Sequence, residues 1–188
     1  MPEGLLPSFC LEFAILHRMA LTQQLARVTP QYLEQCRQNA AASPDEDPRW
    51  DPPQDDILDL DWAIRGLVTF GRWACIEERN LAALERSIAG GDGDVGFLDH
   101  PAVYDGFDVP PALLAPAAVT EVAHALSAFD LTAALNRLPA DDAEAVQACG
   151  FDAFDGHPRD YLIQHFTALR DFYNTASNRG HAVLAWID

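Results

Sequence analysis

The chain contains no lysine, so arginine is its only strongly basic residue. Twelve arginines face 29 aspartates and glutamates, which gives a formal net charge of −17 at pH 7. A surface of this sign repels the phosphate backbone of DNA and RNA, and we therefore expect no nucleic-acid partner. It would attract a basic protein and steer its approach. The simpler interpretation is solubility, codon bias or adaptation to salt, none of which needs a partner.

Cysteine and long apolar runs are scarce. The four cysteines, Cys10, Cys36, Cys75 and Cys149, form no C-x-x-C pair, which argues against zinc knuckles and local redox motifs. We expect four buried free thiols in a reducing cytoplasm. The apolar stretch over residues 11–16 is short and carries Glu12, so it predicts neither a signal peptide nor a membrane span.

Catalytic motifs are lacking as well. The chain has no phosphate-binding P-loop, no dinucleotide-binding glycine fingerprint and no G-x-S-x-G elbow. In the loop over residues 90–96, Asp92 and Asp94 alternate as calcium ligands do, but Gly96 takes the next alternate position and no glutamate closes a calcium loop. We expect no metal, no cofactor and no catalytic residue, and the sequence favours a protein that is not an enzyme.

Apolar spacing and capping residues outline the elements that are present. Residues 20–28 predict a strand, and Thr29 followed by Pro30 predicts the start of a short helix over residues 31–38. A long helix from about Leu58 would place Asp59 and Asp61 in its first turn, where the helix dipole favours negative charge. Three further helices are expected: one that ends at Gly90, one that begins at Pro116, and a short one capped by Asp130.

The end of the chain is the clearest indicator of fold. Residues 161–173 place apolar side chains on one helical face, and Asn178 and Gly180 are residues that close helices. Residues 182–187 are apolar on both sides, as expected for a strand covered on both faces of a sheet. A helix that leads directly into a buried strand implies layers of helix over sheet, an α/β (α+β) arrangement.

Four stretches in this order resemble the YfbM-like family of bacterial proteins, domain of unknown function 1877. They are residues 25–30, residues 58–62, the helix after Leu113-Leu114-Ala115-Pro116, and the closing segment from Tyr161 to Trp186. The resemblance covers residues 19–188 as one domain and leaves residues 1–18 as an N-terminal extension, with Met19 a candidate natural start. Ala115 departs from the family in standing where a capping Ser or Thr is usual.

The resemblance implies a helix-rich domain with helices packed on a small mixed sheet. It implies no activity, cofactor or catalytic residue, so no site residue is transferred from the family.

A candidate partner surface lies in the loop over residues 42–56, which is rich in proline and aspartate. Trp50 stands among several acids there, as an aromatic anchor with an acidic rim would. The alternative is that Trp50 only pins the loop onto the core. The candidate partner-binding residues are Trp50, Asp47, Asp51, Asp55 and Asp56.

Three histidines are candidates for a pocket. His165 lies within the apolar arc of the closing helix, where core packing is the simpler role, and His100 and His157 follow acid-containing loop segments. A pocket at the sheet edge that uses His100, His157 or His165 would suit a small-molecule-binding domain or an enzyme.

We expect a cytoplasmic, non-enzymatic interaction module, an inhibitor or immunity-type partner of a basic protein. The small-molecule-binding domain or enzyme is the alternative. No membrane partner is expected, and the sequence leaves the oligomeric state open.

Overall fold

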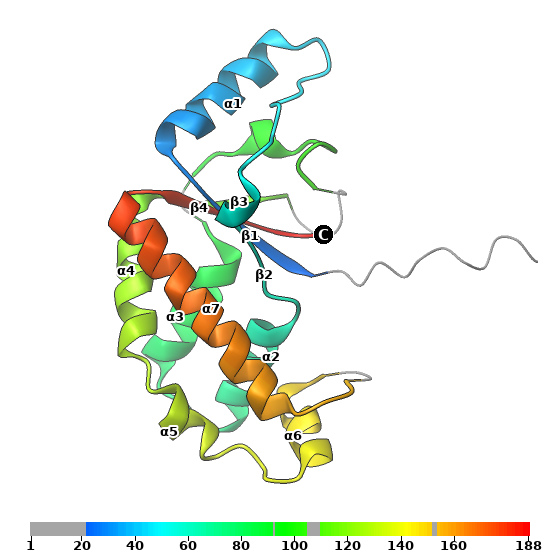
Figure 1. The fold of residues 1–188 in the computed structure, drawn as a ribbon, viewed down its shortest axis with the longest axis vertical. Coiled ribbons are helices and arrows are strands. Elements are labelled where there is room, and N and C mark those ends of the chain that lie inside the picture. The colour runs from blue at the N-terminus through cyan, green and yellow to red at the C-terminus, as the bar shows by residue number, and fades with distance from the viewer. Residues whose placement is uncertain (1–21, 92, 105–109, 152–153) are drawn as a thin grey trace, which may run out of the picture.

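The computed structural model describes residues 22–91, 93–104, 110–151 and 154–188, so the 1–18 extension lies outside the described residues. Its sheet contains β1 (Gln23–Val28), β2 (Ile57–Asp59), β3 (Ala112–Leu114) and β4 (Ala182–Ile187). The strand order is β2-β1-β4-β3, and every described pair is antiparallel, whereas a mixed sheet was expected. The two long strands, β1 and β4, form its centre (Figure 1).

Side chains alternate between the two faces of this sheet and build two apolar clusters. Leu25, Val183 and Ala185 join the larger cluster, which the helices cover. Ala26 and Leu184 join a smaller cluster on the opposite face. All six residues of β4 are buried, which confirms a strand covered on both sides.

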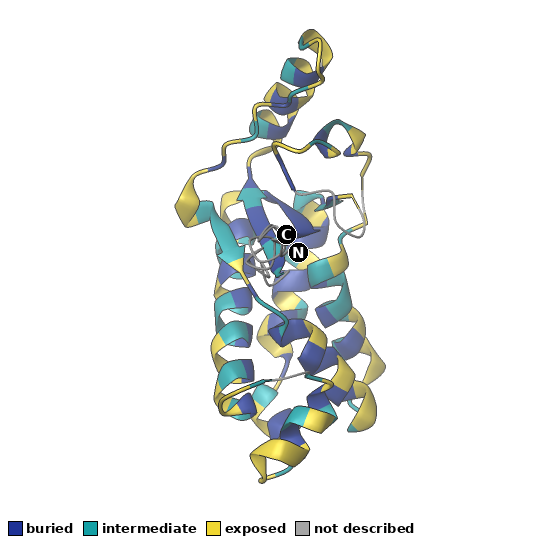
Figure 2. Cartoon of the chain, turned by 90° about the vertical axis from the view of Figure 1, so that its right-hand side faces the viewer, coloured by how far each residue is buried: buried dark blue, intermediate teal, exposed yellow. Residues whose placement is uncertain are grey.

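Helices form a thick layer on one face and a thin one on the other. The thick layer contains α2 (Ala63–Trp73), α3 (Glu78–Ala89), α4 (Pro116–Ala128) and α7 (Pro158–Arg179), with α5 (Leu131–Leu135) and α6 (Asp142–Cys149) at its far end (Figure 1). The opposite face is covered by α1 (Pro30–Ala42) and by the segment around the short helix η2 (Gly96–Leu98). Buried residues line the inner sides of the helices in Figure 2. The α+β class expected from the sequence is confirmed.

Several helix boundaries follow from single residues. The hydroxyl of Thr29 accepts a hydrogen bond from the Tyr32 amide, and the carboxylate of Asp130 accepts one from the Ala133 amide. Gly180 adopts a left-handed conformation (φ 65°) at the end of α7. Ala115 precedes α4 without any side-chain cap, as the sequence predicts.

The helix expected from Leu58 is wrong. Residues 57–59 form β2, in which Leu58 pairs with Leu25 of β1, and α2 begins only at Ala63. Asp61 has a positive φ of 47°, which breaks any helical path between strand and helix. Asp59 and Asp61 are therefore turn residues and do not lie in the first turn of a helix.

The described cysteines are free, but they are not all buried. Cys36 and Cys149 are buried, whereas Cys75 is exposed, which corrects the expectation for that residue, and Cys10 lies outside the described residues. Cys75 has φ 53° in the tight turn between α2 and α3, and this turn lies at the surface. Among the described helices, none combines the length and apolarity that crossing a bilayer requires.

Candidate functional site

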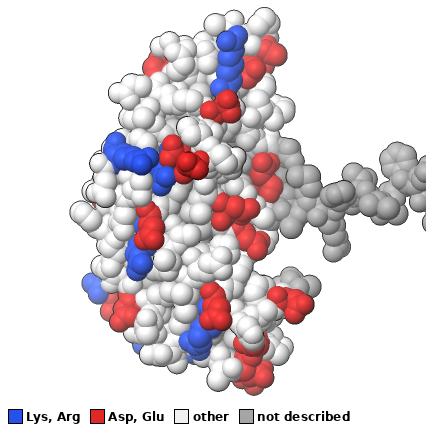
Figure 3. Space-filling model, viewed as in Figure 1, with Lys and Arg blue, Asp and Glu red and all other residues white. Residues whose placement is uncertain are grey.

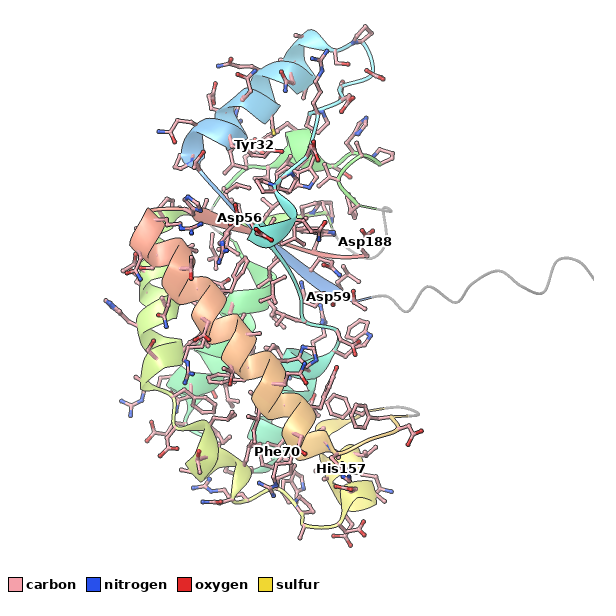
Figure 4. The ribbon with its side chains drawn as sticks, in the orientation of Figure 1. Tyr32, Asp56, Asp59, Phe70, His157 and Asp188 are labelled. Carbon is pink, nitrogen blue, oxygen red and sulfur yellow. The ribbon has the colours of Figure 1, made fainter. Side chains whose placement is uncertain are left out.

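A pocket of about 520 Å³ opens where three connections meet. They are the turn from β2 into α2, the end of α6, and the start of α7. In Figure 4 the labelled residues Asp59 and His157 lie above and below this region. The volume is in the range of sites that bind small molecules.

Asp61 is held at the pocket wall by three neighbouring segments. Its amide donates to Asp59 Oδ1 (2.7 Å), and its carbonyl accepts from the amide of Gln23 in β1 (3.1 Å). The hydroxyl of Tyr161 donates to Asp61 Oδ2 (2.8 Å) and accepts from the Trp62 amide (3.2 Å). The carboxylate of Asp61 is therefore fixed in place before any ligand arrives.

Aromatic rings form a second wall. The ring centroids of Phe151 and Phe154 lie 5.2 Å apart, and that of Tyr161 lies 5.5 Å from Phe151 and 4.9 Å from Phe154. Gly66 makes room for this cluster, because a Cβ at that position would lie 2.1 Å from Phe151 Cε1. The ring of Phe151 thus packs directly on the backbone of α2.

One guanidinium also lines the pocket. Arg65 places its Cζ 5.3 Å from the centroid of the Trp62 ring, and its Nη2 lies 3.5 Å from Oε1 of Gln23. It forms no ion pair with either carboxylate of the pocket, Asp61 or Asp155, in the described part of the chain. The pocket therefore presents two carboxylates and several aromatic faces.

Burial shifts the pKa of three titratable groups at or beside the pocket. Burial raises the pKa of the Cys149 thiol to about 11, so it is protonated at neutral pH and is a poor nucleophile. Burial and the hydrogen bond to Asp61 raise the pKa of Tyr161, which remains a hydrogen-bond donor. Burial lowers the pKa of His165, whose ring packs against Tyr161 with centroids 4.6 Å apart.

Trp50 lies outside this pocket, on the other face of the sheet. Its half-buried ring packs edge-on against Tyr32 (5.6 Å between centroids) and Trp186 (6.3 Å). The amide of Asp51 donates to the Tyr32 hydroxyl (2.6 Å), which ties the same loop to α1. Trp50 therefore packs as the alternative interpretation expects, and because the ring stays half-exposed its binding of a partner stays a prediction.

The loop acids differ from one another in their environment. Asp56 is largely buried and accepts a hydrogen bond from Arg27 Nε (2.7 Å), with Arg179 Nη1 at 3.6 Å. Asp51 and Asp55 are exposed, and the half-buried Asp47 accepts from the Arg49 amide. Only the exposed acids are available to a partner.

The three candidate histidines do not meet in this pocket. His100 lies beside η2 and accepts from the Ala102 amide through Nδ1 (3.0 Å). His157 precedes the first residue of α7 without a capping side-chain hydrogen bond, and its ring pairs with Asp142 (2.8 Å) at the exposed lower end of the molecule. His165 does not line the pocket, and its ring packs behind it against Tyr161, which does.

No group of three or more His, Cys, Asp or Glu side chains with the geometry of a metal site occurs within the described ranges. The 90–96 loop is described only in part, because Asp92 lies outside these ranges.

Sequence reasoning missed the pocket residues, although a signal was present. Asp61 and Trp62 end one of the stretches that carry the family resemblance, and Tyr161 begins another. The structure brings these two stretches into contact through the Tyr161–Asp61 hydrogen bond.

Comparison with known proteins gives a family and a fold. The family described as a domain of unknown function, DUF1877, matches residues 19–186. A crystal structure of YfbM from Escherichia coli, a protein of unknown function, superposes with a TM-score of 0.55 at 12% sequence identity, over 89% of this chain and 99% of that chain. This likeness concerns the fold. A search of curated proteins finds no match.

Proposed function

The chain belongs to the DUF1877 family, a domain of unknown function, and from that premise we propose that it is a non-enzymatic acidic interaction module. Its partner is a basic protein, which it binds as an inhibitor or immunity-type protein. The exposed thiol of Cys75 suits a reducing compartment, and we place the interaction in the cytoplasm.

The observation that carries the proposal is a group of unneutralised carboxylates around the pocket, Asp59, Asp61 and Asp155, which we call the acidic rim. None of the three forms an ion pair in the described part of the chain. Figure 3 shows acidic side chains gathered down the edge of the molecule that lies to the right in that view. A rim of this kind complements a positively charged surface.

Most arginines are already engaged within the chain, which leaves the acidic excess outward-facing. Arg27, Arg72 and Arg86 each contact a carboxylate, and Arg159 donates to the backbone carbonyls of Leu135 and Leu138. With a net charge of −17, the field of the whole molecule would speed the encounter with a basic partner at low salt.

Capture of partners from a host extract tests the proposal. The wild-type chain is expected to retain a basic protein at low salt and to release most of it at high salt. The triple variant Asp59→Asn, Asp61→Asn, Asp155→Asn should lose the protein. The matched variant Asp47→Asn, Asp51→Asn, Asp55→Asn removes the same charge from the loop of Trp50 and should keep it.

Two results would count against the proposal. Recovery of no basic protein under either salt condition contradicts it outright. Equal losses from both triple variants would show that net charge alone matters and would contradict a docking surface at the rim.

The second candidate function is small-molecule binding, and the pocket beside edge strand β2 favours it. Its polar groups are then Asp61, Arg65 and Asp155, and the three histidines lie elsewhere. An NMR screen of small charged compounds tests this function, with the chemical shifts of the pocket residues as the measured quantity. Shifts confined to the pocket at micromolar concentration would support it over the protein partner.

A further inference from the structure

We propose that the pocket beneath the acidic rim receives one arginine side chain of the basic partner. This inference rests on the proposed function and names the group that the site recognises. It is carried by the aromatic wall, the two carboxylates and the volume of the pocket.

The aromatic wall suits a flat cation. The rings of Phe151, Phe154 and Tyr161 pack within 4.9–5.5 Å of one another, and Trp62 lines the same pocket. Aromatic faces attract cations, and the planar guanidinium of arginine also stacks on them, which the ammonium of lysine does not do. Arg65 adopts this arrangement within the chain, with its guanidinium over the Trp62 ring.

The carboxylates supply the directional contacts. Asp61 uses Oδ2 to accept from Tyr161, while Oδ1 accepts no hydrogen bond within the described ranges. Asp155 is exposed and accepts none in that same part of the chain. A guanidinium has five N–H donors, enough for the free acceptors of both residues, and its bonds to carboxylates are charge-assisted and stronger than neutral ones.

The charge of Arg65 has opposite effects on the binding of a cationic and of an anionic ligand, so a substitution there distinguishes the two. Because Arg65 lines the pocket, its charge would repel an incoming guanidinium and attract an incoming carboxylate or phosphate. Replacement of Arg65 by glutamine should therefore strengthen the binding of an arginine side chain. It would weaken the binding of an anion.

The test uses N-acetylarginine amide, whose only charge is the guanidinium, and titrates it into the full chain by NMR. The uncharged citrulline analogue and the lysine analogue serve as comparisons. We expect binding with a Kd on the order of 1 mM, weaker binding of the lysine analogue and none of the citrulline analogue. The NMR chemical-shift changes should be confined to the residues that line the pocket.

Variants assign the binding to the proposed groups. Asp155→Asn should weaken binding by about tenfold, the loss expected when one hydrogen bond to a charged group goes, and Arg65→Gln should tighten it. Glu78→Gln removes an exposed charge at the start of α3 and should change nothing. Asp155 is the decisive position because, unlike Asp61, it holds no structural hydrogen bond in the described residues.

The outcomes distinguish this inference from the proposed function. If the arginine and citrulline compounds bind equally, or if Asp155→Asn has no effect, the arginine pocket is wrong, while capture of a basic protein through the acidic rim can stand. If arginine binds as expected but no basic protein is captured, the proposed function fails and the ligand is not the side chain of a partner.

Discussion

At the scale of single residues, the candidate site depends on positions with little freedom to change. Asp61 adopts φ 47°, a conformation that few residues other than glycine, asparagine and aspartate adopt readily. The carboxylate of the same residue accepts a hydrogen bond from the Tyr161 hydroxyl, and its backbone carbonyl accepts one from the Gln23 amide. It therefore turns the chain from sheet to helix and also presents a carboxylate to the pocket.

Gly66→Ala should destabilise the protein and disturb the aromatic wall. The added Cβ would lie 2.1 Å from the Phe151 ring, so the ring must move. Overpacking of this kind costs about 1–3 kcal/mol, more than the roughly 1 kcal/mol that alanine gains over glycine inside a helix. Chemical unfolding measures the net change.

Gly71→Ala in the same helix is the control for that prediction. Its nearest contact is Leu81 Cδ2 at 2.6 Å, a longer distance than the 2.1 Å at Gly66, and the next atom, Ile76 Cδ1, lies at 3.5 Å. We expect a smaller loss than for Gly66→Ala. A Gly66→Ala variant more stable than the wild type would contradict the packing described.

His157 should titrate above the ordinary histidine pKa. The carboxylate of Asp142 lies 2.8 Å from its Nδ1 and raises the pKa, because it favours the protonated ring. The folded chain therefore binds this proton more tightly than the unfolded chain does. The resulting stabilisation is complete below the unfolded pKa of about 6.5 and disappears as the pH rises through the folded value.

An NMR titration of the histidine ring protons measures this shift. Asp142→Asn should return the pKa of His157 towards the unperturbed value, while Asp141, which caps α6 through its side chain, stays in place. An unchanged His157 pKa in that variant would mean that the pair does not persist in solution.

At the scale of elements, caps and turns decide how far sequence reasoning reaches. Thr29, Asp130 and Gly180 each define a boundary through one local interaction, and those three boundaries were predicted correctly. The start of α2 was missed because residues 57–59 pair with β1, a strand 31 positions away even at the closest register pair, Ala26 with Ile57. Distant strand pairing overrides local periodicity there.

The helix α6 was also missed, although its signals are local. Asp141 caps it, accepting from the Glu144 amide, and Gly150 ends it in a left-handed conformation. The element is only eight residues long and its apolar face is narrow, so periodicity gave little indication of it.

Ala115→Ser should stabilise the protein by supplying the missing cap of α4. Ala115 already has the extended conformation of a capping residue (φ −66°, ψ 157°) but offers no acceptor to the first amides of the helix. A serine cap contributes about 1 kcal/mol relative to alanine. Thermal and chemical unfolding should both register the gain.

Ala117→Ser, two positions further on and exposed within the first turn, provides the comparison. Serine is a weaker helix former than alanine, so this variant should be neutral or slightly less stable. Equal effects of the two substitutions would show that capping is not the cause.

At the scale of the whole molecule, the pocket could not be predicted because its walls come from distant segments. Tyr161 and Asp61 are 100 residues apart in the sequence and meet through one hydrogen bond. Local patterns do reveal carboxylates and aromatic residues, but in this acidic chain they are too common to single out a pair. The acids of the Trp50 loop are close together in the sequence and so form a visible local pattern, whereas the acids of the pocket become neighbours only on folding.

The net charge predicts that salt stabilises the fold. With 29 acidic residues and only 12 arginines, the net charge is −17, and the acidic side chains repel one another in the compact folded state. Raising the NaCl concentration from about 10 mM to about 150 mM shortens the screening length from about 30 Å to about 8 Å, so the melting temperature should rise. A fall in the melting temperature over this range would indicate that ion pairs outweigh repulsion.

The pairing of the two central strands, β1 and β4, affects the order in which parts of the molecule fold. The side-chain amide of Gln23 in β1 donates to the carbonyl of Trp186 in β4, 163 positions away, and every helix that the structure describes lies between them in the sequence. Closing so long a loop is entropically costly and slow compared with forming helices or joining neighbouring ones. The helical layer can therefore form early, while the middle of the sheet is completed last. In a refolding reaction, the amides of β4 would then be among the last to gain protection from hydrogen exchange.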